Sequence, residues 1–107
     1  MKKTVITGTG ALLTVLMLSA ASVVMAEGRS GKEIYANNCI ACHKTGAAGA
    51  PRVGNADSWG DRLDKDKETL YKNAINGIRA MPPMGTCTGC SKDEIRATVD
   101  YMLEQTR

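Results

Sequence analysis

The 107-residue chain contains no phenylalanine, and its aromatic side chains are limited to three tyrosines and one tryptophan. So short a chain with so few aromatic residues has little material for a hydrophobic core, which excludes a large catalytic domain. Small domains of this kind usually depend on a disulfide, a metal or a cofactor for stability. No segment alternates apolar and polar residues as a strand does, and 11 glycines indicate long loops. The sequence therefore predicts one all-α domain whose core needs such a supplement.

Residues 1–26 are predicted to be a secretory signal peptide that is removed. Two lysines follow Met1, an apolar stretch covers residues 12–24, and Ala26 completes a small-x-small cleavage pattern. The apolar stretch is short for a membrane span, which argues against a retained anchor. The mature chain is then residues 27–107, exported to the periplasm, where close cysteine pairs form lasting disulfides. Peripheral membrane association stays open.

The predicted mature chain is nearly neutral. Removal of Lys2 and Lys3 leaves 12 of the 14 basic residues against 11 acidic ones, a balance of +1. Basic residues form no run and alternate with acidic ones, so the sequence predicts no nucleic-acid partner. Near neutrality also predicts weak overall electrostatic steering, with local patches deciding which partner proteins bind.

Three helices are expected between glycine- and proline-rich loops. The first begins after Ser30 with a Ser-x-x-Glu capping box and runs to about Cys42. The second covers about 67–76, with Asp66 as its N-cap and Gly77 as its stop. The third follows Ser91, which opens another capping box. Helical periodicity predicts one apolar face on each of the last two helices. In the second helix it consists of Leu70, Ala74, Ile75 and Ile78, and in the third of Ile95, Val99, Met102 and Leu103. A short turn capped by Ser58 is also expected from Trp59 to Leu63.

The single histidine follows a cysteine pair, in the order Cys39-Ile40-Ala41-Cys42-His43. This C-x-x-C-H pattern is the attachment signature of a c-type haem. Two thiols three positions apart near a helix end reach the two vinyl groups on one edge of the porphyrin. The next residue, His43, then offers an imidazole nitrogen to the iron. The sequence therefore predicts one covalently bound haem c, which also supplies the missing core volume.

Two other roles for these cysteines are less consistent with the sequence. A thioredoxin-like dithiol needs a βαβ context, which the helical pattern does not provide. A zinc site would use four thiolates, those of Cys39, Cys42, Cys87 and Cys90, but an exported chain tends to oxidise such thiols first.

The sixth ligand of the iron is sought among the methionines of the mature chain. Met102 lies on the apolar face of the last helix and is expected in the core. Met81 and Met84 flank Pro82-Pro83, whose fixed φ angles give a stiff loop able to hold a thioether against iron. Such a ligand raises the reduction potential. From the residues alone, the choice between Met81 and Met84 stays open, as does a five-coordinate site.

A second cysteine pair, Cys87-Thr88-Gly89-Cys90, is not followed by a histidine and does not match a haem site. In an oxidising compartment a structural disulfide is expected, closing a short loop worth on the order of 2 kcal/mol. A catalytic dithiol is the alternative.

These motifs resemble those of class I cytochromes c, in particular the cytochrome c5 type, over residues 31–102. The resemblance is carried by Gly-Lys-Glu-Ile-Tyr at 31–35 before the C-x-x-C-H pattern, Gly46–Pro51, Met-Pro-Pro at 81–83 and the Cys87–Cys90 pair. It implies a small class I cytochrome c fold of three to four helices wrapped around one covalently bound haem.

The resemblance also implies roles for individual residues. Cys39 and Cys42 would carry the haem, with His43 and Met81 as the axial ligands of the iron. Cys87 and Cys90 would form a disulfide. The carbonyl of Pro51 would accept a hydrogen bond from the second imidazole nitrogen of His43.

The implied function is periplasmic one-electron transfer by a carrier that is not an enzyme. Its expected partners are redox proteins of a respiratory chain, such as other cytochromes or a terminal oxidase or reductase, and the chain is expected to be a monomer or a weak homodimer. Arg52, Trp59 and Arg62 are candidates to meet the haem propionates, although ordinary surface or core roles account for them equally. The alternative function is a small haem peroxidase or ligand sensor with an open or labile sixth site. The two loop methionines and the lack of a second histidine argue against it.

Overall fold

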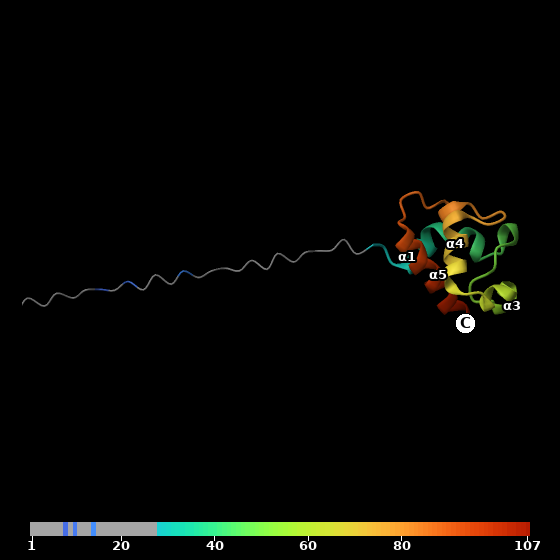
Figure 1. The fold of residues 1–107 in the computed structure, drawn as a ribbon, viewed down its shortest axis with the longest axis horizontal. Coiled ribbons are helices and arrows are strands. Elements are labelled where there is room, and N and C mark those ends of the chain that lie inside the picture. Colours follow the sequence, from blue (N-terminus) through green and yellow to red (C-terminus); the bar gives the residue numbers. More distant parts are fainter. Residues whose placement is uncertain (1–7, 9, 11–13, 15–27) are drawn as a thin grey trace, which may run out of the picture.

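The computed structural model describes residues 8, 10, 14 and 28–107 (Figure 1). Apart from those three positions, the predicted signal peptide lies outside the described residues, so its cleavage stays a prediction. Within the described part, helices and turns make up the secondary structure, with one isolated bridge between Ile78 and Met81 and no strand. The predicted all-α class is confirmed. None of the helices described has the length and apolar character needed to cross a membrane.

The first predicted helix is a continuous helical segment interrupted by one wider turn. It comprises α1 (Gly31–Ile34), a π-helical turn η1 (Tyr35–Cys39) and α2 (Ile40–His43). The predicted capping box is confirmed, since the Ser30 hydroxyl accepts from the Glu33 N–H and the Ser30 N–H donates to the Glu33 carboxylate. The sequence did not predict the π turn. The carbonyl of Ile34, which precedes this turn, accepts a hydrogen bond of 3.3 Å from the Asn38 side-chain amide.

Of the two long helices, the first has the predicted bounds and the second has the predicted start. Helix α4 (Lys67–Asn76) is capped by Asp66 and is followed by Gly77 at φ 84°, in the left-handed region. Helix α5 (Lys92–Thr106) begins with a complete capping box from Ser91. In both cases local side-chain chemistry at the helix end explains why a sequence pattern located it correctly.

The short segment between the first helix and α4 differs from the prediction. Helix α3 (Ala56–Trp59) starts earlier than expected, because Asn55 is its N-cap and accepts a hydrogen bond of 3.1 Å from the Ser58 N–H. The assignment of Ser58 as a cap was therefore wrong. A 3-10 turn η3 (Gly60–Asp64) follows, and two further 3-10 turns are η2 (Ala47–Gly49) and η4 (Pro83–Thr86).

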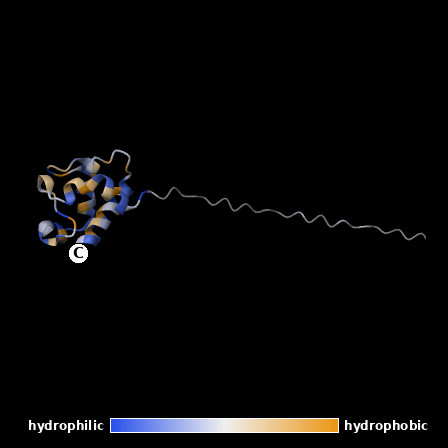
Figure 2. Cartoon of the chain, turned by 180° about the vertical axis from the view of Figure 1, so that it is seen from behind, coloured by the Kyte–Doolittle hydropathy of each residue, from blue (hydrophilic) through white to orange (hydrophobic). Residues whose placement is uncertain are grey.

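The core is small and forms where α5 packs against α1 on one side and α4 on the other. In Figure 2, apolar and polar stretches alternate along these helices, as expected for helices with one buried face. Ile78 was wrongly placed on the α4 stripe, since it follows the helix end and is 42% exposed. The buried apolar residues of the described chain are Ile34, Trp59, Leu70, Ala74, Cys87, Ile95, Val99, Met102 and Leu103.

A pH-dependent contact joins α4 to α5, because Tyr71 donates a hydrogen bond to the Asp100 carboxylate. This bond raises the pKa of Tyr71 from 10.0 to about 12. The unfolded chain therefore loses the Tyr71 proton first as pH rises, so the stability from this group is present below pH 10 and declines towards pH 12. We expect the free energies of unfolding of the wild type and Tyr71→Phe to converge over that range. A pH-independent gap between their denaturant curves would contradict this.

Candidate functional site

The two cysteines of the C-x-x-C-H pattern stand on successive turns of the first helical segment. Cys39 ends the π-helical turn and is half-buried, whereas Cys42 lies in α2 and is exposed. Both are free thiols. Burial raises the pKa of Cys39, and the neighbouring Cys42 adds to the rise. The structure thus presents two unpaired sulfurs directly before His43.

His43 ends α2 and has a fixed ring orientation. Its Nδ1 lies 2.8 Å from the Pro51 carbonyl oxygen, which confirms the predicted acceptor. Since a carbonyl only accepts, Nδ1 carries the proton and Nε2 keeps a free lone pair. Burial lowers the pKa of His43; the hydrogen bond to Pro51 opposes this, and the charge of Arg62 reinforces it. The lowered pKa favours the neutral imidazole, which is the form that binds a metal.

The loop that carries the Pro51 carbonyl is held by hydrogen bonds on both sides. The N–H of Val53 donates to the His43 carbonyl at 2.8 Å. The indole Nε1 of Trp59 donates to the Arg52 carbonyl at 2.8 Å, and its ring stacks on His43 with centroids 6.3 Å apart. Trp59 is 5% exposed and its one N–H is used in this way, so the structure shows it as part of the core.

Ser58 is a supporting residue that sequence reasoning misassigned. Its hydroxyl accepts a hydrogen bond of 2.8 Å from the Arg52 N–H and donates one of 2.7 Å to the Asn55 carbonyl. Because the Arg52 N–H and the Pro51 carbonyl belong to the same peptide group, Ser58 helps to hold that carbonyl in place. No local pattern distinguishes this role from helix capping, because both use a serine hydroxyl near a helix start.

We expect Ser58→Ala to destabilise the protein by about 0.5–1.5 kcal/mol, because the exposed Arg52 N–H exchanges the Ser58 hydroxyl for water. The Pro51 carbonyl should also become less fixed, which broadens the proton resonances of the His43 ring. Denaturant unfolding and NMR of the purified protein measure the two effects. Ser58→Thr retains the hydroxyl and serves as the control. If Ser58→Ala matched the wild type in both measurements, the hydroxyl would not be holding this loop.

The two loop methionines are both half-buried and pack against the core. Met81 is fixed by paired backbone bonds with Ile78, at 2.9 and 3.1 Å. Met84 lies within η4 in a left-handed conformation, at φ 60°. This turn contacts the π-helical turn that ends at Cys39, so the structure brings the methionine loop beside the cysteine pair. Met102, by contrast, is buried in the core as predicted.

The remaining surroundings fit a large apolar cofactor. Cys87 and Cys90 are joined by a disulfide, which contradicts the four-thiolate zinc site. Nor do the described residues form any other cluster of three or more histidine, cysteine or acidic side chains suited to a metal ion. What they do offer is two free thiols, one imidazole nitrogen, thioethers and partly exposed apolar side chains, a combination that suits a covalent haem. The apolar residues that pack on the core but stay partly exposed include Tyr35, Val53, Leu63, Ile75, Met81 and Met84.

Comparison with known proteins agrees with this chemistry. Residues 26–102 match the sequence model of the family described as cytochrome c oxidase, cbb3-type, subunit III. The chain is also similar to a protein named cytochrome c5 from Ectopseudomonas mendocina, with 43% identity over 76 residues, 69% of this chain and 87% of the relative.

Two solved structures share the fold. One is a chain of a crystal structure described as an electron transfer complex of nitrite reductase with cytochrome c, with a TM-score of 0.68 and 34% identity over 72% of this chain and 94% of that one. The other is a mono-haem ferrocytochrome c from Shewanella putrefaciens, with a TM-score of 0.62 and 35% identity over 74% and 96% of the two chains. The predicted small helical fold is confirmed by these neighbours.

Proposed function

We propose that this chain, which belongs to the cytochrome c5 family of class I c-type cytochromes and is a monohaem electron carrier, works in the periplasm as part of a respiratory chain. Its cofactor is one covalently bound haem c. The predicted signal peptide of residues 1–26 supports export, and the Cys87–Cys90 disulfide is consistent with an oxidising compartment.

The hydrogen bond between His43 and Pro51 is the observation that carries this proposal. It leaves the lone pair of His43 Nε2 free to bind a metal, and two unpaired cysteines precede this histidine in the chain. We assign the covalent attachment to Cys39 and Cys42 and one axial position to His43. When bound, the haem would supply a one-electron couple, and the hydrogen bond to Pro51 would fix the orientation of the His43 ring that binds its iron.

We assign the second axial position to Met81. Its backbone is pinned by Ile78 and followed by two prolines, so its side chain has a fixed origin. A neutral sulfur in this position keeps small ligands out and raises the reduction potential, as suits a carrier rather than a peroxidase or sensor.

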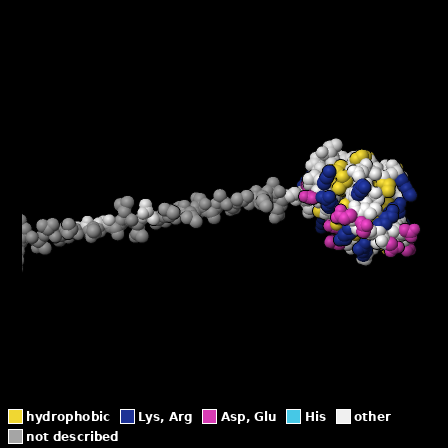
Figure 3. Space-filling model, in the orientation of Figure 1, with side chains coloured by type: hydrophobic (Ala, Val, Ile, Leu, Met, Phe, Trp, Pro, Cys, Tyr) yellow, Lys and Arg dark blue, Asp and Glu magenta, His cyan; other side chains and the backbone are white. Residues whose placement is uncertain are grey.

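The partners are proposed to be other redox proteins. Figure 3 shows acidic and basic side chains interspersed with apolar ones on the visible face, consistent with the near-zero net charge of residues 27–107. Such a surface favours brief, weakly steered encounters. The similarity to a chain described in complex with nitrite reductase supports a terminal reductase or oxidase as acceptor. We expect a monomer or a weak homodimer, with any membrane association peripheral.

Intact mass and a pyridine haemochrome spectrum of the exported protein test the proposal. We expect residues 27–107 plus one haem, with pigment that survives acid–acetone extraction. His43→Ala should lose the low-spin spectrum, whereas Lys44→Ala, at the exposed next position, should keep it. Colourless protein, or a normal spectrum in His43→Ala, would refute the assignment. Rapid binding of carbon monoxide by the wild type would instead favour the open-site alternative.

A further inference from the structure

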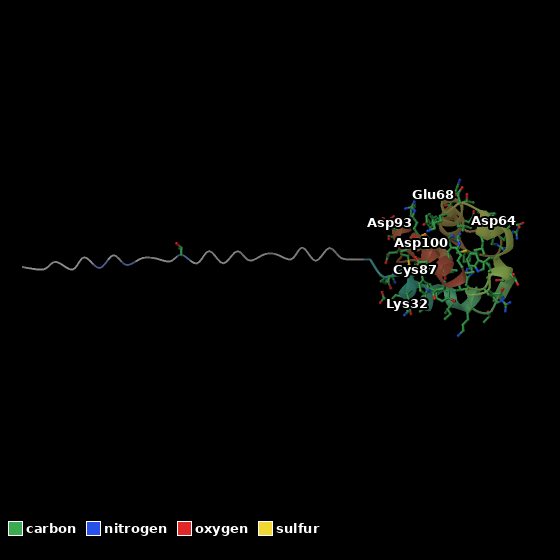
Figure 4. All side chains as sticks on the ribbon, turned by 90° about the horizontal axis from the view of Figure 1, so that it is seen from below. Lys32, Asp64, Glu68, Cys87, Asp93 and Asp100 are labelled. Atoms are coloured by element: carbon green, nitrogen blue, oxygen red, sulfur yellow. A yellow bond between two sulfur atoms is a disulfide. The ribbon has the colours of Figure 1, made fainter. Side chains whose placement is uncertain are left out.

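The Cys87–Cys90 disulfide lies beside a positive charge that the proposed electron transfer does not use. Nη2 of Arg29 is 3.4 Å from Sγ of Cys90 and 3.8 Å from Sγ of Cys87. Cys87, labelled in Figure 4, is buried with 4% exposure, whereas Cys90 is half-buried. Of the two sulfurs, that of Cys90 is therefore the one open to attack from solvent.

Arg29 is held in this position by α5. Its Nε donates to the Glu94 carboxylate at 3.2 Å, and its backbone N–H donates to the same oxygen at 2.9 Å. Glu94 offsets part of the charge, but it also fixes the guanidinium with its Nη2 directed at the sulfurs. Since Arg29 and Cys90 are 61 residues apart, this arrangement is a product of the tertiary fold.

The N-terminus of helix α5 favours negative charge at Cys90. Cys90 immediately precedes Ser91, the N-cap of the 15-residue helix α5. A helix N-terminus and an adjacent arginine both stabilise a thiolate, and neither gives comparable stabilisation to a neutral disulfide. The bridge also spans only three positions, so chain entropy stabilises the oxidised form less than it would for a bridge that closes a long loop. Each of these features shifts the balance towards the reduced pair.

We propose that Cys87 and Cys90 form a second redox site, whose disulfide is reduced in the folded protein by a dithiol. A thiolate of the reductant attacks Sγ of Cys90 and forms a new sulfur–sulfur bond. The Cys87–Cys90 bond breaks, and its electron pair leaves on Sγ of Cys87, which takes a proton from water. The second thiolate of the reductant then displaces Cys90 as a thiolate beside Arg29. The reductant ends as a disulfide, and the pair has gained two electrons.

The test equilibrates the haem-loaded protein with mixtures of reduced and oxidised dithiothreitol, alkylates free thiols and counts the labels by mass. We expect two labels in the wild type while circular dichroism still reports the native fold. Arg29→Met should lower the equilibrium constant for reduction about tenfold, the factor that corresponds to one pKa unit of one thiol. Arg29→Lys should recover part of the loss. Lys32→Met, which removes an exposed cation of α1, should leave the constant unchanged.

Two results would overturn the proposal: no labelling until the protein unfolds, or equal constants for Arg29→Met and the wild type. A parallel arm with thioredoxin identifies the class of reductant. If thioredoxin reduces the disulfide as fully as dithiothreitol does, the reductant is a protein dithiol. If only dithiothreitol reduces it, the reductant is a small-molecule dithiol. Both results support the redox site. Because thioethers protect Cys39 and Cys42, four labels would instead count against the proposed haem attachment and leave the inference about Cys87 and Cys90 standing.

Discussion

Met81→Ala is expected to lower the midpoint potential by at least about 0.1 V, because the identity of the axial ligands moves haem potentials over a range of about 0.8 V. With Met81 as the proposed axial ligand, loss of the thioether removes the donor that favours reduced iron and leaves the sixth position to water or to an added ligand. Potentiometry measures the first effect, and carbon monoxide binding to the reduced protein measures the second.

Met84→Ala is the matched control, since it removes a second half-buried methionine from the same loop. We expect its midpoint potential to differ from that of the wild type by only a small fraction of the shift expected for Met81→Ala. Packing alone predicts similar effects for both, because both side chains lie against the core cluster. A large fall in potential in Met84→Ala with little change in Met81→Ala would show that the other sulfur is the ligand.

The features that the sequence predicted correctly depend on residues close together in the chain. Ser30 and Ser91 each lie three residues before a glutamate, and both capping boxes are present in the structure. Asp66 and Gly77 bound α4 for the same local reasons. The C-x-x-C-H pattern is equally local, and the structure confirms the predicted hydrogen bond between its histidine and Pro51.

The features that the sequence did not predict depend on contacts or competition that no short pattern records. Asn55 and Ser58 are both good N-caps, and the fold uses Asn55 because the Ser58 hydroxyl is engaged by Arg52. The π turn before Cys39 has no marked signal in its residues. The position of Arg29 beside the disulfide arises only when α5 presents Glu94 to the start of the first helix.

Gly31→Ala is expected to destabilise the protein by more than about 3 kcal/mol, at the upper end of what overpacking a core costs. A Cβ atom at Gly31 would stand 2.6 Å from the carbonyl carbon of Ala97 and 2.9 Å from the nitrogen of Thr98, and closer still to the Ala97 oxygen. These are backbone atoms of α5, so no side-chain rotation relieves the clash and the two helices must separate. Helix propensity predicts the opposite sign, since alanine is favoured over glycine by about 1 kcal/mol within a helix.

Denaturant unfolding of the haem-loaded protein decides between the two signs. Gly89→Ala is the control, because the nearest atom to its added Cβ is 3.9 Å away. Ala97→Gly should not rescue Gly31→Ala, since the obstructing atoms belong to the backbone rather than to the Ala97 methyl group. If Gly31→Ala were as stable as the wild type, α1 and α5 would be able to move apart at little cost in free energy. The first helical segment, which carries Cys39 and His43, would then not be anchored through its contact with α5.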